Sequence, residues 1–98
     1  MPTLEILPIA TTSADSADIT VTAGTKKSFF LKAGSGVTEL PKTANVLVMR
    51  KAGTDYVTVF RMTPAVGQSA FIFEATNSDT LLRFRRGVQD AAIGVDQE

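Results

Sequence analysis

Apolar and polar residues alternate with a period of two along most of the chain. The segment from Asp18 to Thr22 shows the pattern clearly, because Ile19 and Val21 stand between polar neighbours. Successive side chains of a strand point to opposite faces, so this pattern is typical of a strand with one face in water. An Ala-Gly turn at 23–24 leads to a second apolar segment at 27–32. Together the two segments predict a β-hairpin.

A second hairpin is indicated further along the chain. Residues 45–50 and 55–61 are rich in β-branched and aromatic residues, and the short link between them contains Gly53. Glycine accepts the positive φ that tight hairpin turns require. Two more strands are expected at 70–74 and 80–85, separated by a polar turn.

The two ends of the chain differ from its middle. Residues 4–9 are expected to be extended, and two prolines in this region cannot donate hydrogen bonds to a neighbouring strand. The last eleven residues carry only acidic charges. We therefore divide the chain into an N-terminal arm or edge strand (1–16), a sandwich core (17–87) and an acidic C-terminal tail (88–98).

The number and spacing of the strands predict the fold class. A chain of 98 residues forms a single domain, and no segment predicts a helix long enough to be stable. About seven short strands separated by regular turn signals are typical of a small antiparallel β-sandwich, either immunoglobulin-like or jelly-roll-like. A small closed barrel is the alternative all-β architecture.

Two of the predicted strands are apolar on both faces, although the outer face of an isolated sandwich should be polar. One interpretation is that these are central strands whose outer apolar residues are simply tolerated. The other is that a second protein surface covers them. The sequence leaves both open. The residues concerned are Val46 and Val48 opposite Leu47 and Met49, and Tyr56 and Phe60 opposite Val57 and Val59.

The composition limits the kinds of chemical site that the chain can form. The chain has neither cysteine nor histidine, so we expect no disulfide, no zinc or other soft-metal site, and no Ser-His or Cys-His nucleophile pair. The aspartates fall in separate loops or outward strand positions and form no glycosidase pair or calcium loop. We expect neither an enzyme nor a bound cofactor. The formal net charge of zero argues against a general nucleic-acid binder, and the N-terminus lacks the features of a signal peptide or membrane span.

The candidate binding residues are three arginines, Arg83, Arg85 and Arg86, which we call the arginine row. On a strand, Arg83 and Arg85 point to one side while Leu82 and Phe84 point to the other. Parallel guanidinium groups bind carboxylates well, so an acidic protein surface is the expected partner. The alternative is that the charges protect a sheet edge against aggregation.

The acidic tail offers a natural complement to the arginine row. Its carboxylates, Asp90, Asp96 and Glu98, could reach the row of the same chain or of a neighbouring subunit. The alternative is a frayed terminus. Apolar residues interleaved in the tail favour docking.

A resemblance runs over most of the chain from residue 17 onward. The stretch Ala17-Asp18-Ile19-Thr20-Val21-Thr22-Ala23-Gly24-Thr25 is similar to the "V-T-V-T-A-G-T" strand and turn that open small phage sandwich domains. The hydrophobic hairpin that follows and the ending Ala92-Ile93-Gly94-Val95-Asp96-Gln97-Glu98 also resemble small structural proteins of tailed-bacteriophage virions. The resemblance implies a β-sandwich that coats phage heads or joins tail assemblies, without catalytic residues.

The resemblance leads to specific expectations about function. It implies a virion location and a capsid decoration, or cement, protein that binds the major capsid protein or another virion protein. It also implies a homo-oligomer, with a trimer favoured. The alternatives are a tail or baseplate component, and an immunoglobulin-like adaptor or recognition module. No nucleic acid or membrane is expected as a partner.

Overall fold

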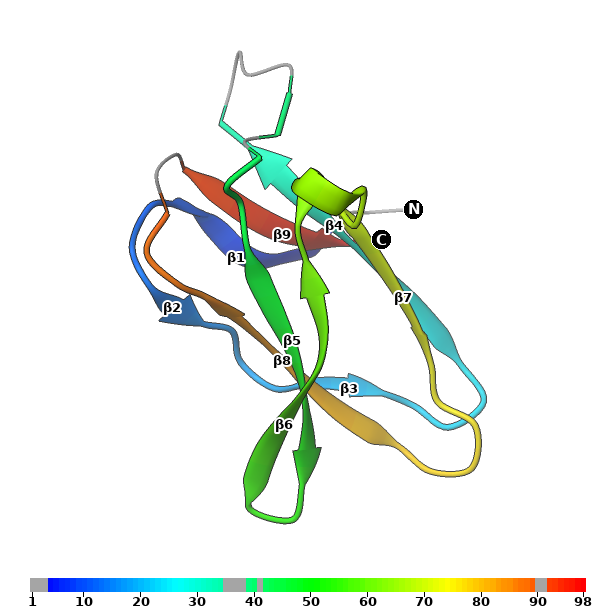
Figure 1. Ribbon diagram of the computed structural model, residues 1–98. Helices are drawn as coiled ribbons and strands as arrows, with labels where there is room; N and C mark the ends of the chain where they lie inside the picture. Colours follow the sequence, from blue (N-terminus) through cyan, green and yellow to red (C-terminus); the bar gives the residue numbers. More distant parts are fainter. Residues whose placement is uncertain (1–3, 35–38, 41, 90–91) are drawn as a thin grey trace.

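The protein is a two-layer β-sandwich. We describe it from a computed structural model that places residues 4–34, 39–40, 42–89 and 92–98. Two antiparallel sheets pack face to face, and the described residues contain nine strands and one short 3₁₀ turn, η1 (Figure 1). The elements are β1 (Leu4–Ala10), β2 (Ala14–Asp15), β3 (Ile19–Val21), β4 (Lys26–Ala33), β5 (Val46–Ala52), β6 (Asp55–Met62), η1 (Pro64–Val66), β7 (Ala70–Glu74), β8 (Thr80–Arg86) and β9 (Ile93–Gln97).

The predicted fold class is confirmed. Sheet A has the strand order β1-β9-β4-β7, and sheet B has the order β2-β8-β5-β6, with β3 also pairing with β8. All of these pairings are antiparallel. The two separate sheets rule out the closed barrel, in which one sheet would close on itself.

Of the two predicted hairpins, only the second is confirmed. Strands β5 and β6 pair across a tight turn in which Gly53 has a φ of 68°. The first prediction is wrong, because β3 pairs with β8 in sheet B whereas β4 pairs with β7 and β9 in sheet A. The turn at Gly24 therefore carries the chain from one sheet to the other. The amide of Gly24 is bonded to the carbonyl of Ala75, in the loop that also crosses between the sheets.

Both ends of the chain belong to the sandwich. Strand β9 is an inner strand of sheet A, between β1 and β4. Leu7 of β1 and the β9 residues Ile93 and Val95 are buried in the hydrophobic core. The core is thus wider than the predicted range of 17–87, because apolar residues alternate on β9 as they do on any other strand.

Side chains from both sheets meet in the core. The rings of Phe29 on β4 and Phe84 on β8 lie 4.6 Å apart, which is typical of packed aromatic pairs. On the side of the sandwich where β6 and β7 are the edge strands, Phe60 and Phe71 continue this packing at 4.8 Å. The other members of the core cluster are Leu7, Val21, Leu31, Ala44, Val46, Val48, Met62, Ala75, Leu82, Ile93 and Val95.

A close backbone approach requires the glycine in β9. A Cβ atom added to Gly94 would lie 2.5 Å from the carbonyl oxygen of Leu7 and 3.0 Å from Cε of Lys32. Neither the backbone of β1 nor the side chain of Lys32 leaves room for a side chain at this position. Only glycine at this position lets β9 fit between its two neighbours.

The strands that are apolar on both faces have different environments. Val46, Val48 and Met49 of β5 are buried, although Met49 lies on the outer side of sheet B, opposite Arg83 on β8. Val57 and Val59 of β6 are exposed on an edge strand. Packing within the described residues therefore explains Phe60 and Met62 of β6, but not Val57 and Val59.

Candidate functional site

Strand β8 presents the arginine row from the middle of sheet B. Leu82 and Phe84 are fully buried, whereas Arg83 and Arg85 lie on the outer face, as the alternation predicts. β8 pairs with β5 on one side and with β2 and β3 on the other. The row therefore does not protect a sheet edge, because β8 is not an edge strand.

Arg85 is held by an aspartate of β2. Its Nε lies 2.8 Å from Oδ1 of Asp15, and its Nη2 lies 3.1 Å from Oδ2. The two residues are direct neighbours in the β2–β8 pairing. This two-point hydrogen bond lowers the pKa of Asp15 below its usual value and raises the pKa of Arg85.

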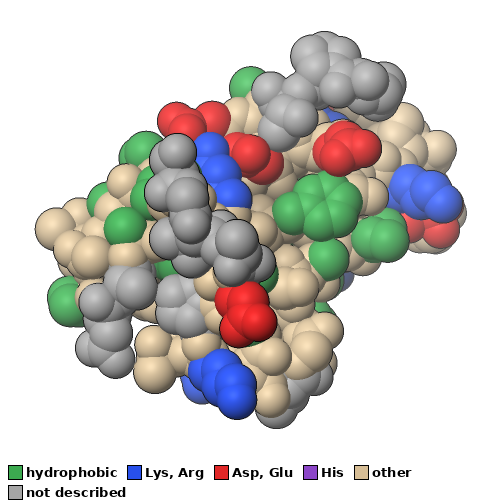
Figure 2. Space-filling view, turned by 90° about the horizontal axis from the view of Figure 1, so that it is seen from above, with side chains coloured by type: hydrophobic (Ala, Val, Ile, Leu, Met, Phe, Trp, Pro, Cys, Tyr) green, Lys and Arg blue, Asp and Glu red, His purple; other side chains and the backbone are tan. Residues whose placement is uncertain are grey.

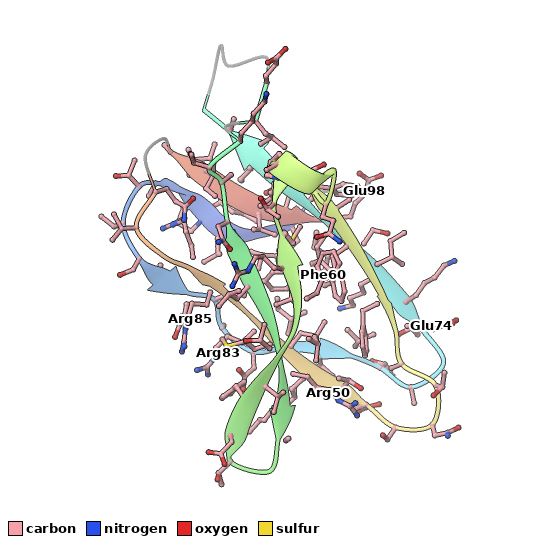
Figure 3. The ribbon with its side chains drawn as sticks, in the orientation of Figure 1. Arg50, Phe60, Glu74, Arg83, Arg85 and Glu98 are labelled. Atoms are coloured by element: carbon pink, nitrogen blue, oxygen red, sulfur yellow. The ribbon has the colours of Figure 1, made fainter. Side chains whose placement is uncertain are left out.

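Arg83 belongs to a second cluster with an aspartate and a tyrosine. Its Nη2 lies 3.0 Å from Oδ1 of Asp18, and the Tyr56 hydroxyl donates to the same carboxylate at 2.8 Å. The guanidinium carbon stacks 4.1 Å from the centre of the Tyr56 ring. The hydrogen bond from Tyr56, together with the charge of Arg83, lowers the pKa of Asp18, and the same bond raises the pKa of Tyr56. In Figure 3, Arg83 and Arg85 lie on the same side of the molecule.

Arg86 is a buried structural residue. Its side chain is among the largest fully buried ones, with a residue exposure of 1%. The guanidinium donates to the backbone carbonyl oxygens of Thr12, Pro8 and Ile93. Arg86 therefore cannot meet a partner as predicted for the row. The alternation that places Leu82 and Phe84 inward also places Arg86 inward, so the sequence contained this signal.

The acidic groups that meet the arginine row come from the N-terminal part of the chain. The sequence predicted separate loops or outward strand positions for Asp15 and Asp18 and no contact with the row, because the pairing of β2 and β3 with β8 has no local signal. The described acidic residues of the tail, Asp96 and Glu98, lie in sheet A. There Asp96 and Glu5 contact Nζ of Lys32 at 2.6 Å and 2.7 Å. Although partial burial opposes it, hydrogen bonds to Asp96 and then Glu5 raise the pKa of Lys32.

The tail therefore does not bring its described carboxylates, those of Asp96 and Glu98, to the arginine row of its own chain. Asp96 bonds to Lys32, and the backbone amide of Glu98 bonds to the Ser28 carbonyl in sheet A. Asp90 lies outside the described residues. Contact of the tail with the row of a neighbouring subunit stays a prediction.

A shallow hollow of about 290 Å³ lies beside the row. Arg61 and Arg85 supply its positive charge, while Leu47 and Val88 supply apolar surface. Asn45 lies on its wall, where the buried Gln89 bonds to both the amide and the carbonyl of Asn45. Two guanidinium groups next to apolar side chains suit an acidic protein segment that also carries a hydrophobic residue.

Neither a metal site nor a membrane-spanning helix is found among the described residues. Among the described residues, no group of three or more carboxylates is arranged to hold a metal ion. The part of the chain that the structure describes has no helix long and apolar enough to cross a membrane. Comparison with known proteins gives no match: no family model, no curated protein and no solved structure is significantly similar to this chain.

Proposed function

We propose that the protein is a non-catalytic structural component of a tailed-bacteriophage virion, a capsid decoration protein that binds the head lattice and stabilises it. The observation that carries this proposal is a set of large hydrophobic side chains left at the surface of a small sandwich. Seven such residues are between 39% and 82% exposed. They are Leu4, Ile9, Phe30, Val57, Val59, Ile72 and Val88.

These side chains are spread over several elements instead of gathered in one ligand pocket. Phe30 and Ile72 lie on neighbouring strands of sheet A, whereas Val57 and Val59 lie on β6 at the edge of sheet B. Figure 2 shows hydrophobic side chains at the surface among acidic and basic ones. Apolar surface with a charged surround is typical of protein–protein contacts.

A coat component needs several contact areas on one rigid body, because it touches its own copies and the lattice together. The broad sandwich faces supply such areas, and the hollow between Arg61 and Arg85 adds a position for a carboxylate. The resemblance of residues 17–25 and 92–98 to phage structural proteins supports a virion as the setting. A tail or baseplate component would use the same contacts at another place in the particle.

The test is location in the purified particle. Virions are separated on a density gradient, the protein is quantified by mass spectrometry against the major capsid protein, and its position is determined by immunogold electron microscopy. A fixed ratio to the capsid protein with label on the heads supports decoration. Label on the tails supports the tail component, and absence from particles that do contain the other structural proteins overturns both.

Arg61→Glu examines whether the hollow takes part in binding to heads, either against the lattice or against a neighbouring copy. Arg61 has no role in the arginine–aspartate pairs described above, so its reversal leaves those pairs in place. We expect the variant to bind undecorated heads at least tenfold more weakly if the hollow receives an acidic segment. Unchanged binding would show that the lattice contacts another face.

A further inference from the structure

The outer face of sheet A has an apolar centre. Phe29 and Leu31 of β4 point into the core, so the alternating Phe30 lies on the outer face. The register places Ala70 and Asp96 on either side of Phe30, and Ile72 two residues beyond Ala70 on β7, opposite Ser28. Phe30 is 39% and Ile72 is 64% exposed, so both contribute hydrophobic surface that the other described residues leave accessible.

Charges around this centre are predominantly acidic. Two lysines face four carboxylates, which gives the outer face of sheet A a formal net charge of −2 among the described residues. Lys32 is shared by two of the carboxylates. The charged residues are Lys26, Lys32, Glu5, Glu74, Asp96 and Glu98.

The outer face of sheet B carries the opposite charge. Four basic side chains face two carboxylates, which gives a formal net charge of +2 among the described residues. Leu47 and Leu81 add half-buried apolar surface, and Tyr56 adds an aromatic ring. The charged residues are Lys51, Arg61, Arg83, Arg85, Asp15 and Asp18.

The two faces lie on opposite sides of the sandwich. In Figure 3, Glu74 and Glu98 lie on the right of the molecule, while Arg83 and Arg85 lie on the left. Two copies that met through the same face would bring like charges together, which opposes association. Two copies that met through different faces would bring the acidic surface against the basic one.

We propose that copies of this chain associate head to tail, with the outer face of sheet A of one copy bound to the outer face of sheet B of the next. This inference rests on the proposed structural role, for which it names a second copy as the partner. Such a contact uses a different surface on each side, so it forms a closed ring or an open stack.

The molecule has enough surface for two such contacts. A stable interface buries about 800 Å² on each partner. Two of them would take roughly 1600 Å² of a total surface of 5758 Å². The exposed Phe30 and Ile72 would lie in the centre of the acidic side, and Leu47 and Leu81 would face them from the basic side.

Sedimentation velocity of the purified protein tests the association. We expect the mass to rise with concentration and to fall when salt is added, because salt screens the charges that orient the contact. A monomer at every concentration in low salt overturns the proposal. An oligomer insensitive to salt also counts against it.

Charge reversal on each face then tests the head-to-tail arrangement. Glu74→Lys with Glu98→Lys makes the acidic face basic, and Lys51→Glu with Arg61→Glu makes the basic face acidic. Each double variant alone should associate at least tenfold more weakly than the unchanged protein. Mixed in equal amounts, the two variants should associate with each other, because each retains one unchanged face and the two reversed faces are again complementary.

The same mixture separates the proposal from its competitors. If only one variant is impaired, copies meet through one face in a symmetric pair and the proposal is wrong. If both are impaired and the mixture stays monomeric, complementary charge does not orient the contact and the proposal is equally wrong. Circular dichroism on each variant checks that the sandwich is folded.

A matched apolar pair provides the last control. Ile72 and Val57 are both exposed β-branched residues on edge strands, but only Ile72 lies on the outer face of a sheet in the proposed contact. Ile72→Ser should weaken association at least tenfold, while Val57→Ser should leave it unchanged. Equal effects would argue against the assigned face.

The outcome is independent of the test of function. A protein that is absent from virions and still associates head to tail would retain this inference and lose the proposed role. A virion protein that stays monomeric would show the reverse.

Discussion

Arg86 shows how one residue can be structural while its neighbours face the solvent. Its guanidinium donates hydrogen bonds to three backbone carbonyl oxygens, two near the N-terminus and one at the start of β9. A buried guanidinium without acceptors would be costly, and these three carbonyls satisfy it. Arg86 thereby connects β8 of sheet B to the N-terminal and C-terminal segments of the chain.

The effect of replacing Arg86 can be compared with that of replacing Arg85. Arg86→Met keeps the length of the side chain and removes the donors, so we expect a loss of about 3 kcal/mol in the free energy of unfolding. Arg85→Met removes an exposed ion pair and should have a much smaller effect. Urea denaturation measures both. Equal losses would contradict the structural role assigned to Arg86.

The local alternation of side chains accounts for two of the three arginines of the row, Arg83 and Arg85. Leu82 and Phe84 inward, and Arg83 and Arg85 outward, follow directly from the period of two. The partners of these arginines could not be predicted, because Asp15 and Asp18 reach them through pairings that span about 65 to 70 residues of sequence. No pattern within β2 or β3 specifies which strand they join.

At the scale of elements, β2 and β3 are too short to be stable alone and depend on β8. They contain two and three residues, respectively. The pairs Asp15–Arg85 and Asp18–Arg83 fix them beside β8. The hydroxyl of Ser16 also accepts a hydrogen bond from the buried amide of Phe84. Two charged pairs and one serine thus attach this edge of sheet B, where the strands are too short for a long ladder of backbone hydrogen bonds.

This attachment predicts a dependence of stability on pH. The pKa values of Asp15 and Asp18 lie below 3.8 in the folded protein. Because the unfolded carboxyls take up protons at higher pH, stability is present above the unfolded pKa and is lost as the pH falls through the folded values. Thermal denaturation should therefore show a decreasing midpoint below about pH 4.

The double variant Asp15→Asn with Asp18→Asn checks the assignment. At neutral pH its midpoint should be lower than that of the unchanged protein by no more than about 5 °C, since exposed ion pairs contribute little. The difference should shrink as the pH falls through the folded pKa values of the two carboxyls, because protonation removes their charge. A difference that persists in acid would point to another cause.

The first hairpin shows why strand pairing is harder to predict than strand positions. A glycine turn between two alternating segments fits a hairpin and also fits a crossing between two sheets. The link from Thr22 to Thr25 makes the crossing, and the bond from Gly24 to Ala75 secures it. The strands were recognisable from local composition, whereas the choice of partner depends on packing across the whole sandwich.

At the scale of the whole molecule, the two chain ends complete sheet A together. Strand β1 pairs with β9 in a register that brings Leu4 opposite Gln97. Of the predicted arm or edge strand, the edge strand is found as β1, and the predicted tail supplies β9 beside it; together they contribute Leu7, Ile93 and Val95 to the core. The sequence predicted two layers of strands, but not that both ends belong to the same layer.

Two leucines of β1 test this integration. Leu7 is 1% exposed and Leu4 is 57% exposed. Leu7→Ala should lower the free energy of unfolding by about 3 kcal/mol, the usual cost of such a change in a packed core. Leu4→Ala should change it by less than about 0.5 kcal/mol. If the two variants unfold alike in urea, β1 is an appended arm and not a strand of the core.

The position of β9 in sheet A also determines when the molecule can complete its folding. A ribosome produces β1 and β4 well before β9, and these two strands have no common neighbour until β9 enters between them. Pairings between such distant segments form slowly. Sheet A is therefore complete only after β9 has been synthesised, and incomplete chains have no finished acidic face with which to enter an assembly.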